Sequence, residues 1–292
     1  MAEELVVPDA SASAFVVPAG ISPAAASSFP IAYGTAYMAL AQRARVGPGT
    51  RVLVLGAGGG VGLAAVQIAK ALGAVVVAVA RGAAKVEACR TAGADACLDS
   101  DALHASSDTK HTKPRSGMET NGTPAPRHAS TQKKKKETFE SLPSATRAAF
   151  GEGNLADVLF DPVGGAAFHR GLSSIRWGGQ ALVIGFASGA IPALPLNVAL
   201  VKNITVHGVY WGAHAAKDPG AMARCAREVG GLLARGSLVP KVDVSATAPL
   251  ARAHRAFAAL EQRRVVGKAV VVVSGEKEAM RAVRGERSVS RL

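Results

Sequence analysis

A glycine-rich segment between two apolar runs has the clearest chemical use in this sequence. Residues 56–62 read GAGGGVG and follow the β-branched run RVLVL at 51–55. A phosphate group reaches the free N–H groups at the start of a helix only where no side chain intervenes, and the tight turn needs backbone angles open mainly to glycine. The spacing Ala57-x-Gly59-x-x-Gly62 therefore predicts a dinucleotide pyrophosphate site. The alternative is a tight turn without a ligand.

The choice of dinucleotide is indicated by the residues that follow the second apolar run. An NAD site would place Asp or Glu there to bind the ribose 2′-hydroxyl, whereas residues 81–85 read RGAAK. A guanidinium can hold a 2′-phosphate through two parallel hydrogen bonds, and a carboxylate would repel it. Arg81 and Lys85 therefore favour NADPH over NADH. The alternative is that both are ordinary solvated surface charges.

These residues must be positioned by alternating strands and helices. Short apolar runs predict buried strands, and helical spacing followed by glycine predicts helices between them. We expect strands at 51–55, 75–79, 96–98, 157–160, 181–185, 204–209 and 268–273, and helices at 63–72, 85–91, 166–175, 219–235 and 250–261. This order predicts an α/β fold with a doubly wound parallel (Rossmann) sheet of about six strands.

The charge of the chain is concentrated in two segments. The 292 residues carry 34 Lys and Arg against 21 Asp and Glu, a formal net charge of +13. Residues 110–136 hold eight Lys or Arg and one Glu, and residues 275–292 hold five Lys or Arg and three Glu. We expect no nucleic-acid groove from charges placed this way. Residues 103–140 contain few large apolar side chains, which predicts a disordered insertion.

The ends of the chain bear on localisation. The start MAEELVVPDA lacks the basic and apolar regions of a secretory signal, and the apolar stretch 52–80 is too interrupted for a membrane span. The final residues Ser290, Arg291 and Leu292 resemble a peroxisomal S-K-L address. They predict contact with an import receptor and location in a peroxisome-like organelle. A cytoplasmic location is the alternative.

The sequence offers little for metal or acyl-transfer chemistry. Cys89, Cys97 and Cys225 form neither a disulfide framework nor a CxxC clamp, which indicates a reducing compartment and no metal site. The histidines include no HExxH or HxxxH pair, and no G-x-S-x-G segment occurs. We therefore expect neither a zinc alcohol dehydrogenase nor a hydrolase.

Several longer segments resemble a known family. The segments AYGTAYMAL, RVLVLGAGGGVGLAAVQIAKALGA, DVLFDPVGG, WGGQALVIGFASG and VGKAVVVV look like the zinc-free, zeta-crystallin-like quinone oxidoreductases of the medium-chain dehydrogenase/reductase superfamily. The resemblance covers roughly residues 14–100 and 150–273. It implies an NADPH-dependent enzyme in which a Rossmann domain is joined to a GroES-like β domain, with the cofactor between the two.

The resemblance also implies the domain organisation. Family chains have on the order of a hundred residues before the segment that matches Phe15, as expected for a domain of ordinary size. Most of the GroES-like catalytic domain is therefore expected to be missing, which would leave the substrate pocket without one wall. We expect a remnant of that domain at 1–30, the NADP domain at 31–239, a return to the catalytic domain at 240–275 and a basic tail at 276–292.

Roles for individual residues carry over from the matching motifs. Asp161 in DPVGG is expected to be a structural turn residue and not a catalytic one. The implied cofactor contacts comprise the pyrophosphate turn, the 2′-phosphate cations and the nicotinamide side. They are Gly59, Gly60, Val61 and Gly62 for the pyrophosphate, Arg81 and Lys85 for the 2′-phosphate, Thr35, Gly185, Phe186 and Ala187 for the nicotinamide side, and Lys268 near the cofactor. No catalytic acid or base is assigned.

The resemblance implies hydride transfer from NADPH, without a metal, to a quinone or an enone-like acceptor. Such chemistry needs little acid assistance, because the oxygens of a reduced quinone can be protonated from solvent. Two alternatives stay open: an enoyl-thioester (enoyl-CoA) reductase, and a non-catalytic NADPH-binding protein. The family also implies a homodimer formed through an edge strand such as 204–209.

Overall fold

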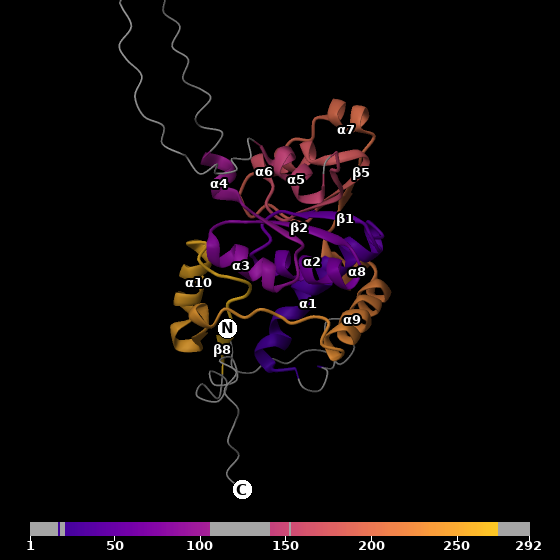
Figure 1. Cartoon of the computed structure of the whole chain (residues 1–292). Coiled ribbons are helices and arrows are strands. Elements are labelled where there is room, and N and C mark those ends of the chain that lie inside the picture. The colour runs from indigo at the N-terminus through magenta and orange to yellow at the C-terminus, as the bar shows by residue number, and fades with distance from the viewer. Residues whose placement is uncertain (1–16, 18–20, 106–140, 152, 274–292) are drawn as a thin grey trace, which may run out of the picture.

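A six-stranded parallel sheet forms the centre of the computed structural model, which describes residues 17, 21–105, 141–151 and 153–273 (Figure 1). The strand order is β3-β2-β1-β4-β5-β6, and every neighbouring pair is parallel. The strands are β1 (Arg51–Val54), β2 (Val75–Ala80), β3 (Ala96–Asp99), β4 (Ala156–Asp161), β5 (Ile175–Val183) and β6 (Thr205–Gly208). This order is that of the doubly wound dinucleotide-binding fold, so the predicted fold class is confirmed.

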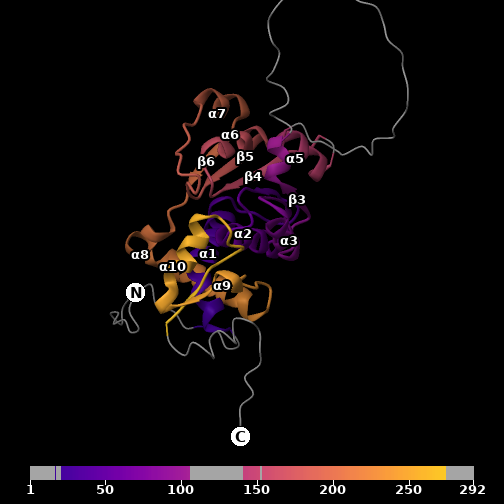
Figure 2. The same cartoon turned by 90° about the vertical axis from the view of Figure 1, so that its left-hand side faces the viewer.

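Helices cover both faces of the sheet, as Figure 2 shows from the side. One face carries α1 (Pro23–Tyr37), the π-helical turn η1 (Met38–Arg43), α2 (Gly60–Ala71), α3 (Ala83–Thr91) and α9 (Pro219–Ala234). The other face carries α4 (Ser100–Ala105), α5 (Leu142–Phe150), α6 (Gly165–Ser173) and α7 (Leu196–Lys202). Two short helices, α8 (His214–Lys217) and α10 (Ala253–Glu261), lie outside these layers.

The central strands β1, β2 and β4 are mostly apolar because both faces of the sheet are covered. Val52 and Val54 belong to the cluster under α1 and α2, whereas Leu53 and Leu55 belong to the cluster under α5 and α6. Successive residues of a strand point to opposite faces, so a strand between two helical layers needs an unbroken apolar run. This requirement explains why RVLVL is recognisable in the sequence as a buried strand.

Two strand boundaries differ from the prediction. β5 begins at Ile175, inside the range expected for a helix, and α6 ends at Ser173. The polar and glycine residues from Arg176 to Gln180 conceal the first half of β5, and its pairing with β4 has an irregular register there. The last strand, expected at 268–273, is reduced to β8 (Val271–Val272), which pairs with β7 (Ala248–Pro249).

Helix α1, a buried helix that packs against α2, was not predicted from the sequence. It begins after Ser22, whose Oγ accepts a hydrogen bond from the backbone N of Ala25 at 3.2 Å, and it continues through Pro30. The domain boundary expected at residue 30 therefore falls inside a helix. α1 shows no amphipathic period because Ala, Ser and Gly make up much of it.

Some predictions concern residues that the structure does not describe. Most of the expected insertion, residues 106–140, lies outside the described residues, and so do Ser290, Arg291 and Leu292. The first residues of that insertion, 103–105, are the end of α4 and thus helical. Among the residues that are described, no helix combines the length and the apolar character needed to cross a lipid bilayer.

Candidate functional site

The glycine turn joins the end of β1 to the start of α2. Gly56 has a φ of +57°, and the backbone N of Gly59 donates to the carbonyl of Gly56 at 3.2 Å. A Cβ at Gly62 would lie 2.4 Å from the carbonyl oxygen of Gly56, so close packing of α2 on the strand requires glycine there. A Cβ at Gly59 would meet nothing nearer than 3.6 Å. Gly59 therefore borders open space at the first turn of α2.

No side chain caps the start of α2. The backbone N–H groups of Gly60, Val61 and Gly62 belong to the first helical turn, where no intrahelical partner exists for them. These donors and the positive end of the helix dipole favour an anion at this place. The predicted pyrophosphate residues thus lie together at the uncapped start of α2.

Lys268 places a cation beside the same turn. Its side-chain stem covers Gly60, where an added Cβ would lie 2.8 Å from Lys268 Cδ. The segment is held there by a hydrogen bond from Gly267 N to Gly58 O at 3.0 Å. Burial lowers the pKa of Lys268, and its ammonium makes no ion pair or hydrogen bond within the described part of the chain. A half-buried ammonium without a counter-charge is costly unless an anion binds beside it.

A second group of cations lies past the end of β2. Lys85 is half-buried, and its Nζ donates to the backbone carbonyl of Arg263 at 2.7 Å. Burial lowers the pKa of Lys85, and the charges of Arg81 and Arg263 lower it further. Arg81 is more exposed and forms an ion pair with Asp101 at 3.5 Å. The cluster carries excess positive charge where a ribose 2′-phosphate is expected.

Arg263 is the residue of this cluster that the sequence did not reveal. It follows α10 and has a φ of +56°, in the left-handed region that non-glycine residues seldom adopt. Its approach to Lys85 depends on how the segment after α10 crosses the glycine turn. No local sequence pattern encodes that crossing. The one available signal was that Arg263 lies only five positions before Lys268, a predicted cofactor residue.

Three of the four residues expected at the nicotinamide side lie at the same edge of the sheet, farther along it. Gly185, Phe186 and Ala187 follow β5, and the backbone N of Ala187 donates to Pro162 O at 3.0 Å. Thr35 is buried on α1, with 6% of its surface exposed. In the part of the chain that the structure describes, no hydrogen bond links these four residues to the glycine turn.

Asp161 has the structural role that the sequence predicted. Its carboxylate accepts hydrogen bonds from the backbone N of Val163 at 2.7 Å and from that of Gly164 at 3.1 Å. Burial raises the pKa of Asp161, and the two hydrogen bonds act in the opposite direction. The residue therefore fixes the turn between β4 and α6, and Gly164 of that turn contacts Phe186.

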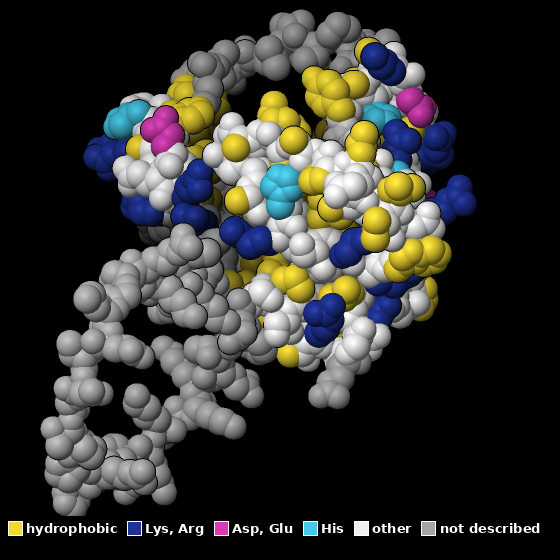
Figure 3. All heavy atoms as spheres, turned by 90° about the horizontal axis from the view of Figure 1, so that it is seen from above, with side chains coloured by type: hydrophobic (Ala, Val, Ile, Leu, Met, Phe, Trp, Pro, Cys, Tyr) yellow, Lys and Arg dark blue, Asp and Glu magenta, His cyan; other side chains and the backbone are white. Residues whose placement is uncertain are grey.

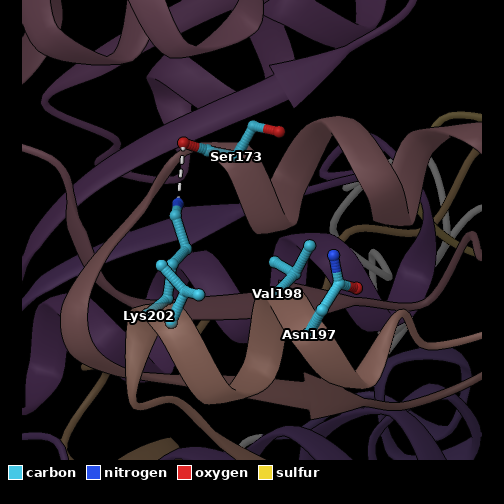
Figure 4. Close-up of a pocket in the computed structure, with 5 residues that line it drawn as sticks. Ser173, Asn197, Val198 and Lys202 are labelled. Atoms are coloured by element: carbon cyan, nitrogen blue, oxygen red, sulfur yellow. Dashed lines mark hydrogen bonds between the residues drawn. The ribbon is translucent and has the colours of Figure 1, made fainter.

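A cavity between α6 and α7 lies away from these residues. Its volume is about 370 Å³, and Ser173, Asn197, Val198 and Lys202 line it (Figure 4). Lys202 is already engaged, because its Nζ donates to the carbonyls of Leu172, Ser173 and Ile175 at 2.8–3.1 Å. This lysine closes the C-terminal end of α6 and leaves no free charge for a ligand.

The comparisons with known proteins match this architecture. Residues 60–227 match the family model described as zinc-binding dehydrogenase. A quinone oxidoreductase-like protein 2 homolog from Nematostella vectensis is 31% identical over 93% of this chain, and the chain spans 63% of that relative's length. Among the described residues, no group of three His, Cys, Asp or Glu lies close enough to hold a metal ion, so this part of the chain does not fit the zinc of the family's name.

Solved structures agree in fold. The Escherichia coli quinone oxidoreductase complexed with NADPH has a TM-score of 0.71 and 24% identity, covering 90% of this chain and 69% of its own. An NAD-dependent alcohol dehydrogenase has a TM-score of 0.69 and 26% identity, covering 92% of this chain and 64% of its own. The chain belongs to the zinc-binding dehydrogenase family, within the medium-chain dehydrogenase/reductase superfamily that its motifs indicate.

Proposed function

We propose that this chain is the cofactor-binding part of an NADPH-dependent oxidoreductase that reduces a quinone or an enone-like acceptor. The observation that carries the proposal is the position of Lys268. Its ammonium lacks a counter-charge among the described residues and stands beside the uncapped start of α2. A diphosphate bridge would satisfy both the ammonium and the free N–H groups at once.

The roles of the chain's own residues follow from this placement. Gly59 leaves space for the diphosphate, the first-turn N–H groups donate to it, and Lys268 balances its charge. When bound, the cofactor supplies a hydride from its nicotinamide C4, which with one solvent proton reduces a quinone to a hydroquinone and leaves NADP⁺. Thr35 and Phe186 are assigned to orient the nicotinamide, which is the protein's contribution to such a reaction.

The preference for NADPH over NADH rests on Arg81, Lys85 and Arg263. A 2′-phosphate would relieve the mutual repulsion of these three cations, which adds to burial in lowering the pKa of Lys85, while Asp243 acts in the opposite direction. The name of the Escherichia coli structure, a quinone oxidoreductase complexed with NADPH, is consistent with this proposal. A free ribose 2′-hydroxyl would leave in place the excess of positive charge that remains after Asp101 pairs with Arg81 and Asp243 acts on Lys85.

One paired experiment tests the proposed function. NADPH oxidation is followed with a panel of quinones, enones and an enoyl-CoA, beside a calorimetric titration with NADPH alone. Turnover of quinones or enones supports the proposal. Turnover of enoyl-CoA alone selects an enoyl-thioester reductase, and tight binding without any turnover selects a non-catalytic binding protein. Absence of NADPH binding contradicts all three readings.

We also infer a homodimer that forms along β6. This strand ends the described sheet, and strand edges pair readily with a second copy. The neighbouring surface around α7, seen in Figure 3, carries several large apolar side chains. The most exposed of them are Ile191, Leu196, Leu200 and Val201. Analytical ultracentrifugation checks the inference: a dimer is expected, and Leu200→Glu should shift it toward monomer.

A further inference from the structure

The amide side chain of Gln67 joins α2 to the segment that follows α9. Its Nε2 donates to the backbone carbonyl of Val239 at 2.9 Å, and its Oε1 accepts the backbone N–H of the same residue at 2.8 Å. The side chain of Val239 adds little packing, because 67% of its surface is exposed. The two hydrogen bonds therefore fix the backbone at this position, next to the buried Leu238.

Tyr33 sets the orientation of the Gln67 amide. Its hydroxyl, on the buried helix α1, donates to Gln67 Oε1 at 3.1 Å. Burial raises the pKa of Tyr33, so the hydroxyl keeps its proton and stays a donor. A donor at this place matches the amide oxygen, which leaves the amide nitrogen to face the carbonyl of Val239. The amide is thus held ready to receive the segment after α9.

Two residues beyond Val239, the same segment pairs with the backbone of Lys268. The backbone N of Lys268 donates to Lys241 O at 3.0 Å. The backbone N of Asp243 donates to Lys268 O at 2.7 Å. Both backbone groups of Lys268 are therefore bonded to the segment that Gln67 fastens to α2.

The glycine turn lies on the other side of this backbone. Gly267 N donates to Gly58 O at 3.0 Å, and Gly267 pairs with Gly59 in an isolated parallel bridge. The approach of the outer segment is close, since a Cβ at Gly267 would lie 2.4 Å from the carbonyl oxygen of Lys241. Lys268 thus lies in a backbone that is enclosed between the glycine turn and the segment after α9.

We propose that Gln67 is a positioning residue for the cofactor diphosphate, and that it acts by holding Lys268 beside the uncapped start of α2. The proposal deepens the proposed function and rests on it. Gln67 lies seven residues beyond Gly60, about 10 Å along the helix at 1.5 Å per residue, so it acts through Lys268 and not on the diphosphate itself. Helix α2 thereby supplies the N–H donors and also fixes the cation that accompanies them.

A double-mutant cycle tests this role by calorimetric titration with NADPH. Gln67→Met keeps the size of the side chain and removes its hydrogen bonds, and it should weaken NADPH binding about three- to tenfold. In a Lys268→Met background the same change should have little effect, because the cation that Gln67 positions is already absent. Equal losses in the two backgrounds would show that Gln67 acts on the fold in general and would overturn the proposal.

Gln180 offers a matched control for this cycle. Its Nε2 also donates to a distant backbone carbonyl, that of Ala44 at 3.1 Å, but it belongs to β5 and bonds no residue of the glycine turn. Gln180→Met should leave the affinity for NADPH unchanged. Gln67→Ala, with the best helix former at this position, repeats the test should the methionine variant not fold.

A second measurement needs no cofactor. Burial lowers the pKa of Lys268, and NMR titration of ¹³C-labelled lysine, assigned with Lys268→Met, reports that pKa. Gln67→Met should loosen the segment, hydrate the ammonium and move the pKa upward toward its ordinary value, whereas Gln180→Met should not. An unchanged pKa in a folded Gln67→Met variant would overturn the proposal. Failure of the unaltered chain to bind NADPH would instead overturn the proposed function, and the role of Gln67 toward the diphosphate with it.

Discussion

Lys85 donates a hydrogen bond of 2.7 Å from its Nζ atom to the backbone carbonyl of Arg263, 178 positions later in the chain. This bond ties the segment after β2 to the segment that precedes β8. It brings a third cation to the two that follow the second strand. The expected 2′-phosphate subsite is therefore assembled from two distant segments, and only the first of them can be recognised in the sequence.

The first prediction concerns these cations. Replacing Arg81 and Lys85 together by Ala should weaken NADPH binding at least tenfold, because each hydrogen bond to a charged group contributes about 1.5–3 kcal/mol. NADH binding should hardly change, since only the 2′-phosphate is addressed. Calorimetric titration measures both affinities. Arg90→Ala on the same helix, whose arginine pairs with Glu87, is the matched control. Equal losses for both cofactors would refute the assignment.

Lys268 should have opposite effects on stability and on binding. Burial lowers its folded-state pKa, so the unfolded chain binds that proton more tightly, and stability rises as pH climbs through the interval between the two values. Lys268→Met should therefore raise the Tm of the free protein at neutral pH, by about 2 °C, while weakening NADPH binding about tenfold. Thermal unfolding with and without NADPH measures both effects.

The pH dependence of cofactor binding provides a control for the same lysine. In the unaltered chain, the affinity for NADPH should fall as pH rises through the lowered pKa of Lys268, because the ammonium loses its charge. Lys268→Met should remove that fall. A variant that loses both stability and binding in parallel would show that Lys268 is a packing residue.

Two glycines of the turn should respond differently to the same added methyl group. At Gly62 the new Cβ would lie 2.4–2.8 Å from the backbone of Gly56 and Ala57, so Gly62→Ala should destabilise the fold by about 1–3 kcal/mol. At Gly59 the methyl would make only an ordinary contact, 3.6 Å from the carbonyl oxygen of Gly56, so Gly59→Ala should leave the Tm unchanged and weaken NADPH binding. Urea unfolding and titration separate the two effects. Retained NADPH affinity in Gly59→Ala would contradict the placement of the diphosphate.

Asp157 should determine part of the acid sensitivity of the sheet. Partial burial raises its pKa, but hydrogen bonds from Arg51 and Arg176 outweigh burial and lower the pKa from 3.8 to about 2. The stabilisation is thus present above pH 3.8 and is lost as pH falls toward 2. Asp157→Asn should cost about 1 kcal/mol at pH 7, allowing for solvent screening. Urea unfolding from pH 7 to pH 2.5 should show the two proteins converging in acid.

The sequence predicts the parts of the fold that have a local signal. Runs such as residues 51–55 are visible because strands covered on both faces are continuously apolar, and the glycine turn is visible because packing at Gly62 tolerates no side chain. Helix α1 could not be predicted because many of its own residues are small and give it no apolar stripe. The polar and glycine residues between Arg176 and Gln180 conceal the first half of β5. Arg263 was missed because its place beside Lys85 depends on which distant segments become neighbours.

Dinucleotide binding at the start of α2 is measured most directly by calorimetric titration of the folded chain with NADPH and, separately, with NADH. NADPH should bind saturably at one site per chain, with an affinity at least tenfold above that for NADH. Two results would contradict it. No heat with either cofactor would show that the start of α2 does not bind the diphosphate. Equal affinities would show that Arg81, Lys85 and Arg263 do not bind the 2′-phosphate.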